Sequence, residues 1–220
     1  MPRALHDAVR ITSAAALIDG DLHVPENAAG LVIFAHGSGS SRFSRRNRAV
    51  AGELEGEGFA TLLLDLLTPD EESLDQRTGE YRFDIDLLGR RVVGATDWVR
   101  ARPELHRLPI AFFGASTGAA AALIAAAERP EVTKAVISRG GRPDLAGEAL
   151  PLVQAPTLLI VGGRDEPVIE LNRDAMLRMR APVEIQIVPG ATHLFEEPGA
   201  LEEVSKLAAG WCRRHLVEER

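Results

Sequence analysis

Short apolar runs alternate with longer amphipathic stretches along most of the chain. Six runs have the length of strands and mostly lack polar alternation, which is typical of strands covered by helices on both faces. They are residues 31–35, 59–64, 110–113, 135–138, 157–161 and 183–188. Between them, apolar side chains recur at helical spacing, as in Ile85, Leu88 and Val92. The predicted helices are residues 45–57, 84–102, 117–128, 170–179 and 199–216.

This alternation of strand and helix predicts an α/β fold with right-handed crossovers and a mostly parallel, doubly wound sheet. Ahead of it, residues 9–12 and 15–24 predict an antiparallel pair at the edge of the sheet, with Asp19-Gly20-Asp21 as the turn. No repeat or low-complexity linker divides the chain, so we predict one domain over residues 1–220, without a large cap domain.

The acidic segment 69–80 is the longest predicted loop. It is either a rim or lid over a site, or a solvated surface loop.

Composition and charge narrow the function classes. The formal net charge of −7 argues against a general nucleic-acid surface. Cys212 is the one cysteine, which excludes an intramolecular disulfide and a thiolate metal site. Residues 1–10 lack the apolar core of a signal peptide, and no stretch approaches the ~20 apolar residues of a membrane span. We therefore expect a cytoplasmic protein without a membrane or nucleic-acid partner.

The segment Phe112-Phe113-Gly114-Ala115-Ser116-Thr117-Gly118 joins an apolar strand to an alanine-rich helix through a Gly-x-Ser-x-Gly motif. This context predicts a sharp turn that raises the Ser116 hydroxyl above the sheet as a nucleophile. The alternative is a strand-to-helix turn in which Ser116 only caps the helix. A reactive serine needs a base within hydrogen-bond reach and a third group that orients the base.

Two later strand ends supply candidates for these partners. A buried strand and a glycine turn precede Asp165, and Asp165 either serves the site or caps the helix ahead of Pro167. His193 follows the strand at residues 183–188 and precedes the last predicted helix. Catalytic groups collect at the carboxyl ends of parallel strands, which favours Asp165 and His193 as the acid and the base.

The loop after the first parallel strand, His36-Gly37-Ser38-Gly39, is a candidate oxyanion site. We predict that the backbone N–H groups of Ser38 and Thr117 stabilise the developing negative charge. His36 is a competing base in principle, but its place beside this loop favours a structural hydrogen bond.

With these motifs the chain resembles the α/β-hydrolase fold family, and within it the small, capless dienelactone-hydrolase-like group. The chain order Ser116, Asp165, His193 matches that family, as do His36-Gly37-Ser38-Gly39 and Gly190-Ala191-Thr192-His193. The resemblance implies a Ser-His-Asp triad, an acyl-enzyme and no metal or organic cofactor. Dienelactone hydrolases proper carry cysteine at the elbow, so Ser116 favours a general serine carboxylesterase.

The expected substrate is a small-molecule ester of short acyl chain or a lactone, with or without a carboxylate. Gly39, Arg42, Arg139 and Arg142 are candidate substrate-binding residues because they flank the predicted site. The alternative is that the arginines pair with nearby carboxylates, and Asp144, Glu148 and Asp165 are candidates for that pairing.

Other functions remain open from the sequence. A Rossmann-type nucleotide site is disfavoured because Arg42 occupies the position of the third glycine. A non-catalytic binding protein on the same scaffold, or a narrowly specific thioesterase or peptidase, would keep the same motifs. The chain is expected to be a monomer or a small homo-oligomer.

Overall fold

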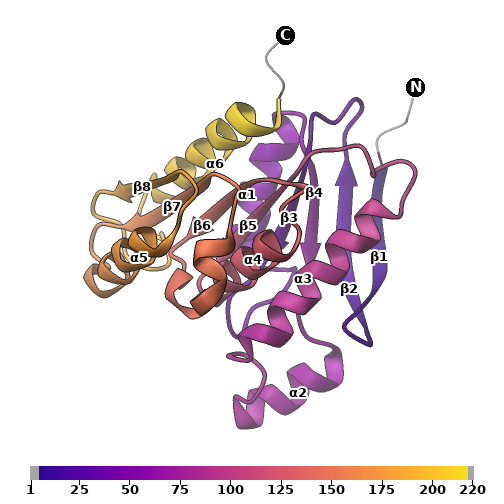
Figure 1. Ribbon diagram of the computed structural model, residues 1–220, viewed down its shortest axis with the longest axis horizontal. Helices are drawn as coiled ribbons and strands as arrows, with labels where there is room; N and C mark the ends of the chain where they lie inside the picture. The colour runs from indigo at the N-terminus through magenta and orange to yellow at the C-terminus, as the bar shows by residue number, and fades with distance from the viewer. Residues whose placement is uncertain (1–4, 218–220) are drawn as a thin grey trace.

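The computed structural model describes residues 5–217 and confirms the predicted α/β fold (Figure 1). Residues 1–4, part of the segment that argues against a signal peptide, lie outside the described residues. Eight strands form one sheet in the order β1-β2-β4-β3-β5-β6-β7-β8. They are β1 (Leu5–Ser13), β2 (Ala16–Val24), β3 (Leu31–Ala35), β4 (Ala60–Leu64), β5 (Ile110–Ala115), β6 (Thr133–Arg139), β7 (Thr157–Gly162) and β8 (Val183–Val188).

Strands β3 to β8 run parallel to one another, and β1 and β2 form the predicted antiparallel edge. The helices are α1 (Arg45–Gly56), α2 (Pro69–Thr78), α3 (Ile85–Arg100), α4 (Thr117–Glu128), α5 (Glu166–Arg178) and α6 (Ala200–Leu216), with a 3₁₀ segment η1 (Pro143–Leu152). Because the carboxyl ends of parallel strands share one edge, the loops after β3, β5, β7 and β8 meet there.

Side chains that alternate along the strands form two cores. Ile33 and Phe112 face a core completed by α3, α4 and α5, whereas Phe34 and Phe113 face α1 and α6. The rings of Phe34 and Phe113 lie 4.8 Å apart between centroids. Each fully buried side chain of this size contributes about 1.5–3 kcal/mol through the hydrophobic effect. The sheet is therefore held from both faces, which fixes the strand ends that carry the site.

The turn of the N-terminal hairpin was placed wrongly by the sequence. Asp19-Gly20-Asp21 lies inside β2, where Gly20 pairs with Val9 and Leu64. The turn is made by Ala14 and Ala15, whose φ angles are +45° and +59°. Positive φ at both central residues suits the twist of a tight hairpin, although alanine rarely adopts it. Glycine and aspartate were therefore a misleading turn signal here.

The predicted loop at residues 69–80 is also wrong, because most of it is helix α2. Thr68 accepts the N–H of Glu71 through its hydroxyl, and the Glu71 side chain accepts the N–H of Thr68. Gly79 ends the helix with φ +69°. These are the signals of a capping box and a glycine C-terminus, and they outweigh the polar composition.

Helix α5 begins earlier than predicted, at Glu166 instead of residue 170. Pro167 lies in its first turn, where a missing N–H costs nothing.

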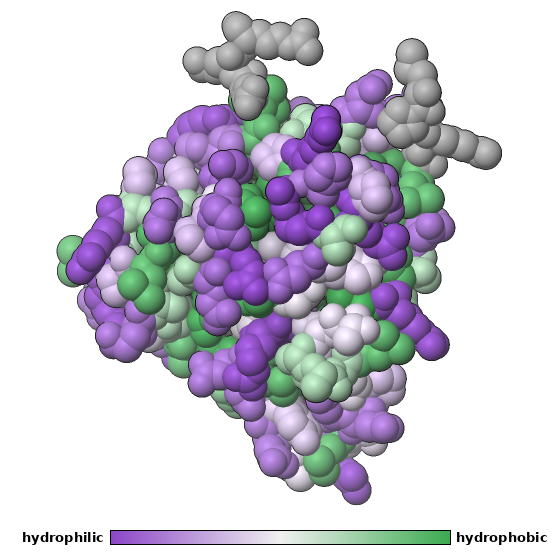
Figure 2. All heavy atoms as spheres, turned by 45° about the vertical axis from the view of Figure 1, so that its right-hand side comes forward, coloured by the Kyte–Doolittle hydropathy of each residue, from purple (hydrophilic) through white to green (hydrophobic). Residues whose placement is uncertain are grey.

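No helix within residues 5–217 is both long enough and apolar enough to span a bilayer. The face shown in Figure 2 carries hydrophilic residues across most of its area, with apolar residues in smaller groups between them.

Candidate active site

Ser116 lies in the turn between β5 and α4, with φ +51° and ψ −122°. Its side chain makes no capping hydrogen bond to α4, so the hydroxyl does not have the helix-capping role that was the alternative. Two flanking glycines permit this turn. A Cβ at Gly114 would lie 2.4 Å from the Cα of Ala119, and one at Gly118 would lie 2.3 Å from the carbonyl oxygen of Ala35. Larger residues would push α4 away from the sheet, so the glycines bring Ser116 close to the strand ends.

Asp165 and His193 are joined directly. Oδ2 of Asp165 lies 2.7 Å from Nδ1 of His193. An ionised carboxylate only accepts, so Nδ1–H donates and Nε2 remains as an acceptor. Asp165 occupies the N-cap position of α5 but makes no side-chain capping bond there. Its carboxylate therefore serves His193 and not the helix.

Ser116 and His193 line the same small cavity, which we call the Ser116 cavity; its volume is about 90 Å³. The other lining residues are Gly37, Ser38, Ser40, Ser44, Arg46, Asn47, Ala115, Arg139 and Leu194. The loops after β3, β5 and β8 thus converge at one edge of the sheet, as the motif spacing predicted. This arrangement places a hydroxyl, an imidazole and a carboxylate within one site.

The candidate oxyanion loop is organised differently from the prediction. The N–H of Ser38 donates to Oγ1 of Thr117 over 3.0 Å instead of facing an open site. The two hydroxyls also lie 3.0 Å apart, and that of Ser38 donates to the carbonyl of Arg82. Thr117 is the first residue of α4, so its own N–H has no acceptor within the helix. The Thr117 N–H is therefore the donor that the geometry leaves for an oxyanion.

His36 has a structural position. Its Nε2 accepts the N–H of Leu66, and its Nδ1 lies 2.9 Å from the carbonyl of Gly37. Burial lowers the pKa of His36, although the Gly37 carbonyl and the charges of Asp65 and Glu72 act in the opposite direction. A neutral His36 thus ties the loop after β3 to the segment after β4.

Two of the three candidate substrate-binding arginines already have carboxylate partners. Arg42 forms a short ion pair with Asp65, and its Nε lies 3.3 Å from Asp21. Arg142 binds Asp144 through two bonds of 2.9 and 2.7 Å. The pair of Arg142 with Asp144 is one that the alternative stated above named, whereas the partners of Arg42 were not among its candidates. Neither arginine lines the Ser116 cavity.

Arg139 differs from the other two arginines. It lines the Ser116 cavity and is only 6% exposed, yet no carboxylate lies within ion-pair distance of it among residues 5–217. Its Nη2 donates to Oδ1 of Asn47 over 3.2 Å, and its buried Nε has no partner within the described chain. Burial, together with the charge of Arg46, lowers the pKa of Arg139 to about 10. The guanidinium remains cationic near neutral pH and is available to an anionic group in the cavity.

Asn47 was not among the predicted site residues. It lies on α1, is buried, and holds Arg139 across the sheet edge. A buried asparagine within a helix is unusual because its amide requires partners, and that was the available signal. Gly39 lies outside the Ser116 cavity and lines a second, larger one.

No three histidine, cysteine, aspartate or glutamate side chains of residues 5–217 are grouped so that they could hold a metal ion.

Comparison with known families and structures gives consistent results. The model of the dienelactone hydrolase family matches residues 18–214. A dienelactone hydrolase from Anabaena variabilis is 54% identical, with a TM-score of 0.94, over 97% of this chain and 99% of that one. Est1E from Butyrivibrio proteoclasticus shares the fold, with a TM-score of 0.77 at 19% identity over 94% of this chain and 98% of that one.

A Mycobacterium tuberculosis protein that is provisionally named a phosphoribosyl transferase is 54% identical over 215 residues. The match covers 98% of this chain but only 48% of that protein, so the chain spans about half the length of this curated relative.

Proposed function

The chain belongs to the dienelactone hydrolase family, and on that premise we propose that it is a serine hydrolase of short-chain carboxylic esters or lactones. The observation that carries the proposal is that His193 lines one cavity with Ser116 and lies 2.7 Å from Asp165. The provisional name of the mycobacterial relative does not transfer to this chain, because the chain covers half of that protein. A serine, a histidine and an aspartate at one sheet edge suit acyl transfer instead.

In the proposed mechanism, Oγ of Ser116 attacks the carbonyl carbon while Nε2 of His193 takes the hydroxyl proton. Asp165 keeps the imidazole in the required tautomer and stabilises its charged form. The N–H of Thr117 stabilises the oxyanion, and the N–H of Ser38 joins it once released from the Thr117 hydroxyl. His193 then protonates the leaving alcohol. Water, deprotonated by His193, releases the acyl group and restores Ser116.

The Ser116 cavity also suggests the acyl group. A volume of about 90 Å³ suits a short chain. Arg139 supplies a buried positive charge there without a carboxylate partner in the described chain, which favours an acyl group that bears a carboxylate.

The first test is hydrolysis of p-nitrophenyl esters, from acetate to longer chains, by the wild type and by a Ser116→Ala variant of confirmed fold. The proposal expects a rate that depends on Ser116 and falls as the acyl chain lengthens. A folded wild type that is no faster than Ser116→Ala on any ester would indicate a narrowly specific hydrolase or a binding protein.

The second test concerns Arg139 and compares a neutral ester with its carboxylate-bearing analogue. Arg139→Met, which keeps most of the volume, is expected to lower kcat/KM for the charged ester about 10- to 100-fold relative to the neutral one. Arg142→Met is the matched control, because Arg142 is already bound to Asp144. Equal losses on both esters in Arg139→Met would remove anion recognition from the proposal.

A further inference from the structure

A second cavity, of about 470 Å³, lies next to the Ser116 cavity. Ser40 and Ser44 line both cavities, so the two cavities are adjacent. The second cavity lies between the loop after β3 and the start of α2. Its volume falls within the ~300–1,000 Å³ that is usual for small-molecule sites.

Four hydroxyl side chains line the second cavity, together with the apolar Phe43, Leu67 and Pro69. The hydroxyl oxygens of Ser41, Ser44 and Thr68 accept backbone N–H groups from Phe43, Asn47 and Glu71, respectively. A hydroxyl that accepts through oxygen still carries a proton that it can donate. These three side chains and Ser40 can therefore donate to oxygen atoms inside the cavity.

Helix α2 supplies acceptors. Glu72 and Gln76 line the cavity from α2, and Nε2 of Gln76 lies 3.3 Å from Oε1 of Glu72. Asp19, Asp65 and Glu72 all line the cavity with carboxylates. Asp65 is paired with Arg42, and Asp19 lies 3.6 Å from Arg10 and 3.8 Å from Arg42, whereas Glu72 has no cationic partner within 4.0 Å among residues 5–217. One free carboxylate beside several hydroxyl donors matches a ligand whose groups both donate and accept.

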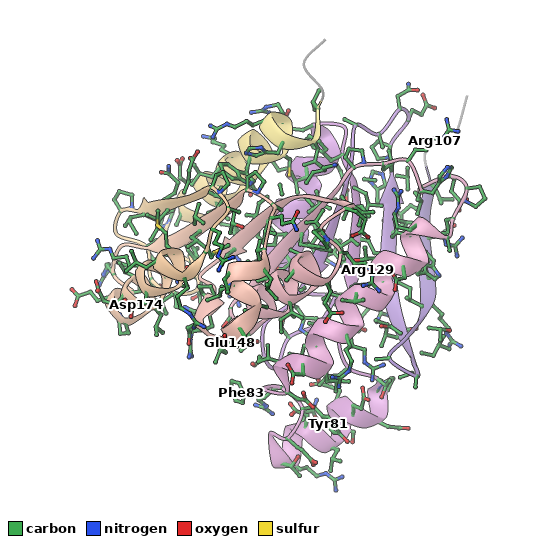
Figure 3. The ribbon with its side chains drawn as sticks, viewed as in Figure 1. Tyr81, Phe83, Arg107, Arg129, Glu148 and Asp174 are labelled. Atoms are coloured by element: carbon green, nitrogen blue, oxygen red, sulfur yellow. The ribbon has the colours of Figure 1, made fainter. Side chains whose placement is uncertain are left out.

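Helix α2 is held in place, so this wall is preformed. The buried carboxylate of Asp75 accepts the N–H groups of Tyr81 and Arg82 over 2.8 Å each, and it also binds the Arg82 side chain. Figure 3 shows Tyr81 and Phe83 on the segment that leads from α2 to α3. Arg91 on α3 binds Glu71 over 2.7 Å. Both ends of α2 are therefore anchored to neighbouring structure.

We propose that the second cavity binds a hydroxyl-rich alcohol portion of the substrate, such as a glycerol or sugar unit, with Glu72 as its acceptor for vicinal hydroxyls. This inference rests on the hydrolase function proposed above. The second cavity would bind the alcohol portion of the ester, whereas Arg139 would bind the acyl portion. An anionic group would meet Glu72 without a cation in the cavity wall. A permanently cationic group would leave the hydroxyl donors unpaired.

The test compares glycerol monoacetate with the acetate of the glycerol dimethyl ether, which keeps the shape and the acyl group but lacks hydroxyl donors. We expect kcat/KM for glycerol monoacetate to be higher by about tenfold. Glu72→Gln and Ser40→Ala are each expected to bring this ratio towards one. Asp70→Asn, a change on the same helix outside the cavity, is the matched control and should leave the ratio unchanged.

The outcomes separate this inference from the proposed function. If the wild type hydrolyses p-nitrophenyl acetate through Ser116 but treats the two glycerol esters alike, the inference fails and the hydrolase function stands. A preference for acetylcholine over glycerol monoacetate would also overturn it, because a cation would then occupy the cavity. No hydrolysis of any ester would instead remove the function on which the inference rests.

Discussion

Burial is the main control on the reactivity of the Cys212 thiol, against the smaller opposing effect of the Arg213 charge. Cys212 lies on α6 and faces the core beneath Trp211 and Leu216, and burial raises the pKa of its thiol to about 12. We predict that the folded protein reacts with a thiol reagent at pH 8 at least ~1,000-fold more slowly than an exposed cysteine, because the thiolate is the reactive form. The measurement is labelling with a chromogenic disulfide, with and without 8 M urea. Rapid stoichiometric labelling of the folded protein would contradict this.

The buried imidazole of His36 makes stability depend on pH. Burial lowers its pKa in the folded state, so below the unfolded value of about 6.5 the unfolded chain binds a proton that the folded chain does not. Its stabilising contribution is therefore complete above about pH 6.5 and decreases on acidification, by at most ~1.4 kcal/mol per pH unit.

The check is the free energy of unfolding in urea at pH 7.5 and pH 5.5, for the wild type and His36→Gln. The variant is expected to be less stable at both pH values. The difference between the two proteins should be smaller at pH 5.5, where the contribution of His36 has decreased. The other titrating groups are the same in both proteins, so their effects cancel in the comparison. A difference that stays constant or grows on acidification would show that His36 is not held neutral.

Among single residues, the sequence predicted Ser116, Asp165 and His193 at one sheet edge because each lies in the turn or loop that follows a strand. Local sequence also placed His36 in a structural hydrogen bond. The partners of Arg42 and Arg142 depend on which carboxylates the chain brings near them, so the sequence left them open. The Ser38 N–H was assigned to an oxyanion because the competing Thr117 hydroxyl is 79 residues away in the chain.

Helix α4 packs so closely against the end of strand β3 that position 118 has room for glycine only. A Cβ at position 118 would lie 2.3 Å from the Ala35 carbonyl oxygen and 2.4 Å from that of His36, and backbone atoms cannot move aside cheaply. We expect Gly118→Ala to destabilise the protein by about 2–3 kcal/mol and to lower the proposed ester hydrolysis at least tenfold, since overpacking would shift Ser116.

Gly52→Ala is the matched control for this prediction. Gly52 lies on the exposed face of α1, and a Cβ there would meet no atom within 4 Å. The substitution should raise the free energy of unfolding by about 0.5–1 kcal/mol through helix propensity, without loss of activity. Urea unfolding and ester hydrolysis measure both variants, and equal behaviour of the two would contradict the packing argument.

The boundaries of helices and strands were predictable where the apolar pattern was strong, and less predictable where capping residues set the ends of a helix. Strands β3 and β5 agree with their apolar runs to within two residues. Helix α2 was missed because ten mostly polar residues offer little periodicity, although the capping box at Thr68 and Glu71 was readable. The hairpin turn at Ala14 and Ala15 carries no sequence signal, because pairing of β1 with β2 imposes positive φ on ordinary alanines.

For the whole molecule, the two tryptophans report on opposite faces of the sheet. Trp98 on α3 packs against one core, and Trp211 on α6 belongs to the other. If both cores unfold as one unit, single-tryptophan variants Trp98→Phe and Trp211→Phe should each give a fluorescence transition that coincides with the loss of far-ultraviolet circular dichroism in urea. Separated midpoints within one variant would show that the two faces unfold independently.

The mostly parallel sheet with an antiparallel edge was predictable from strand and helix alternation, and it is confirmed. The second cavity was not, because its walls come from segments separated in the chain, the loop after β3 and helix α2. Gly39 was a candidate substrate-binding residue because it flanks the predicted site, yet it lines the second cavity and not the Ser116 cavity.

The backbone geometry at Ser116 occurs a second time in the molecule. Gly147 in η1 has φ +53° and ψ −122°, nearly identical to the +51° and −122° of Ser116. Glycine adopts these angles without steric strain, whereas serine does not. The free energy of unfolding of Ser116→Gly should therefore exceed that of Ser116→Ala by about 1 kcal/mol, and Ser116→Gly should unfold at the higher temperature. Neither variant keeps the Ser116 hydroxyl. If Ser116 is the proposed nucleophile, selection for folding and selection for chemistry oppose each other at this position, and a descendant that no longer needed the activity would gain stability by replacing the serine.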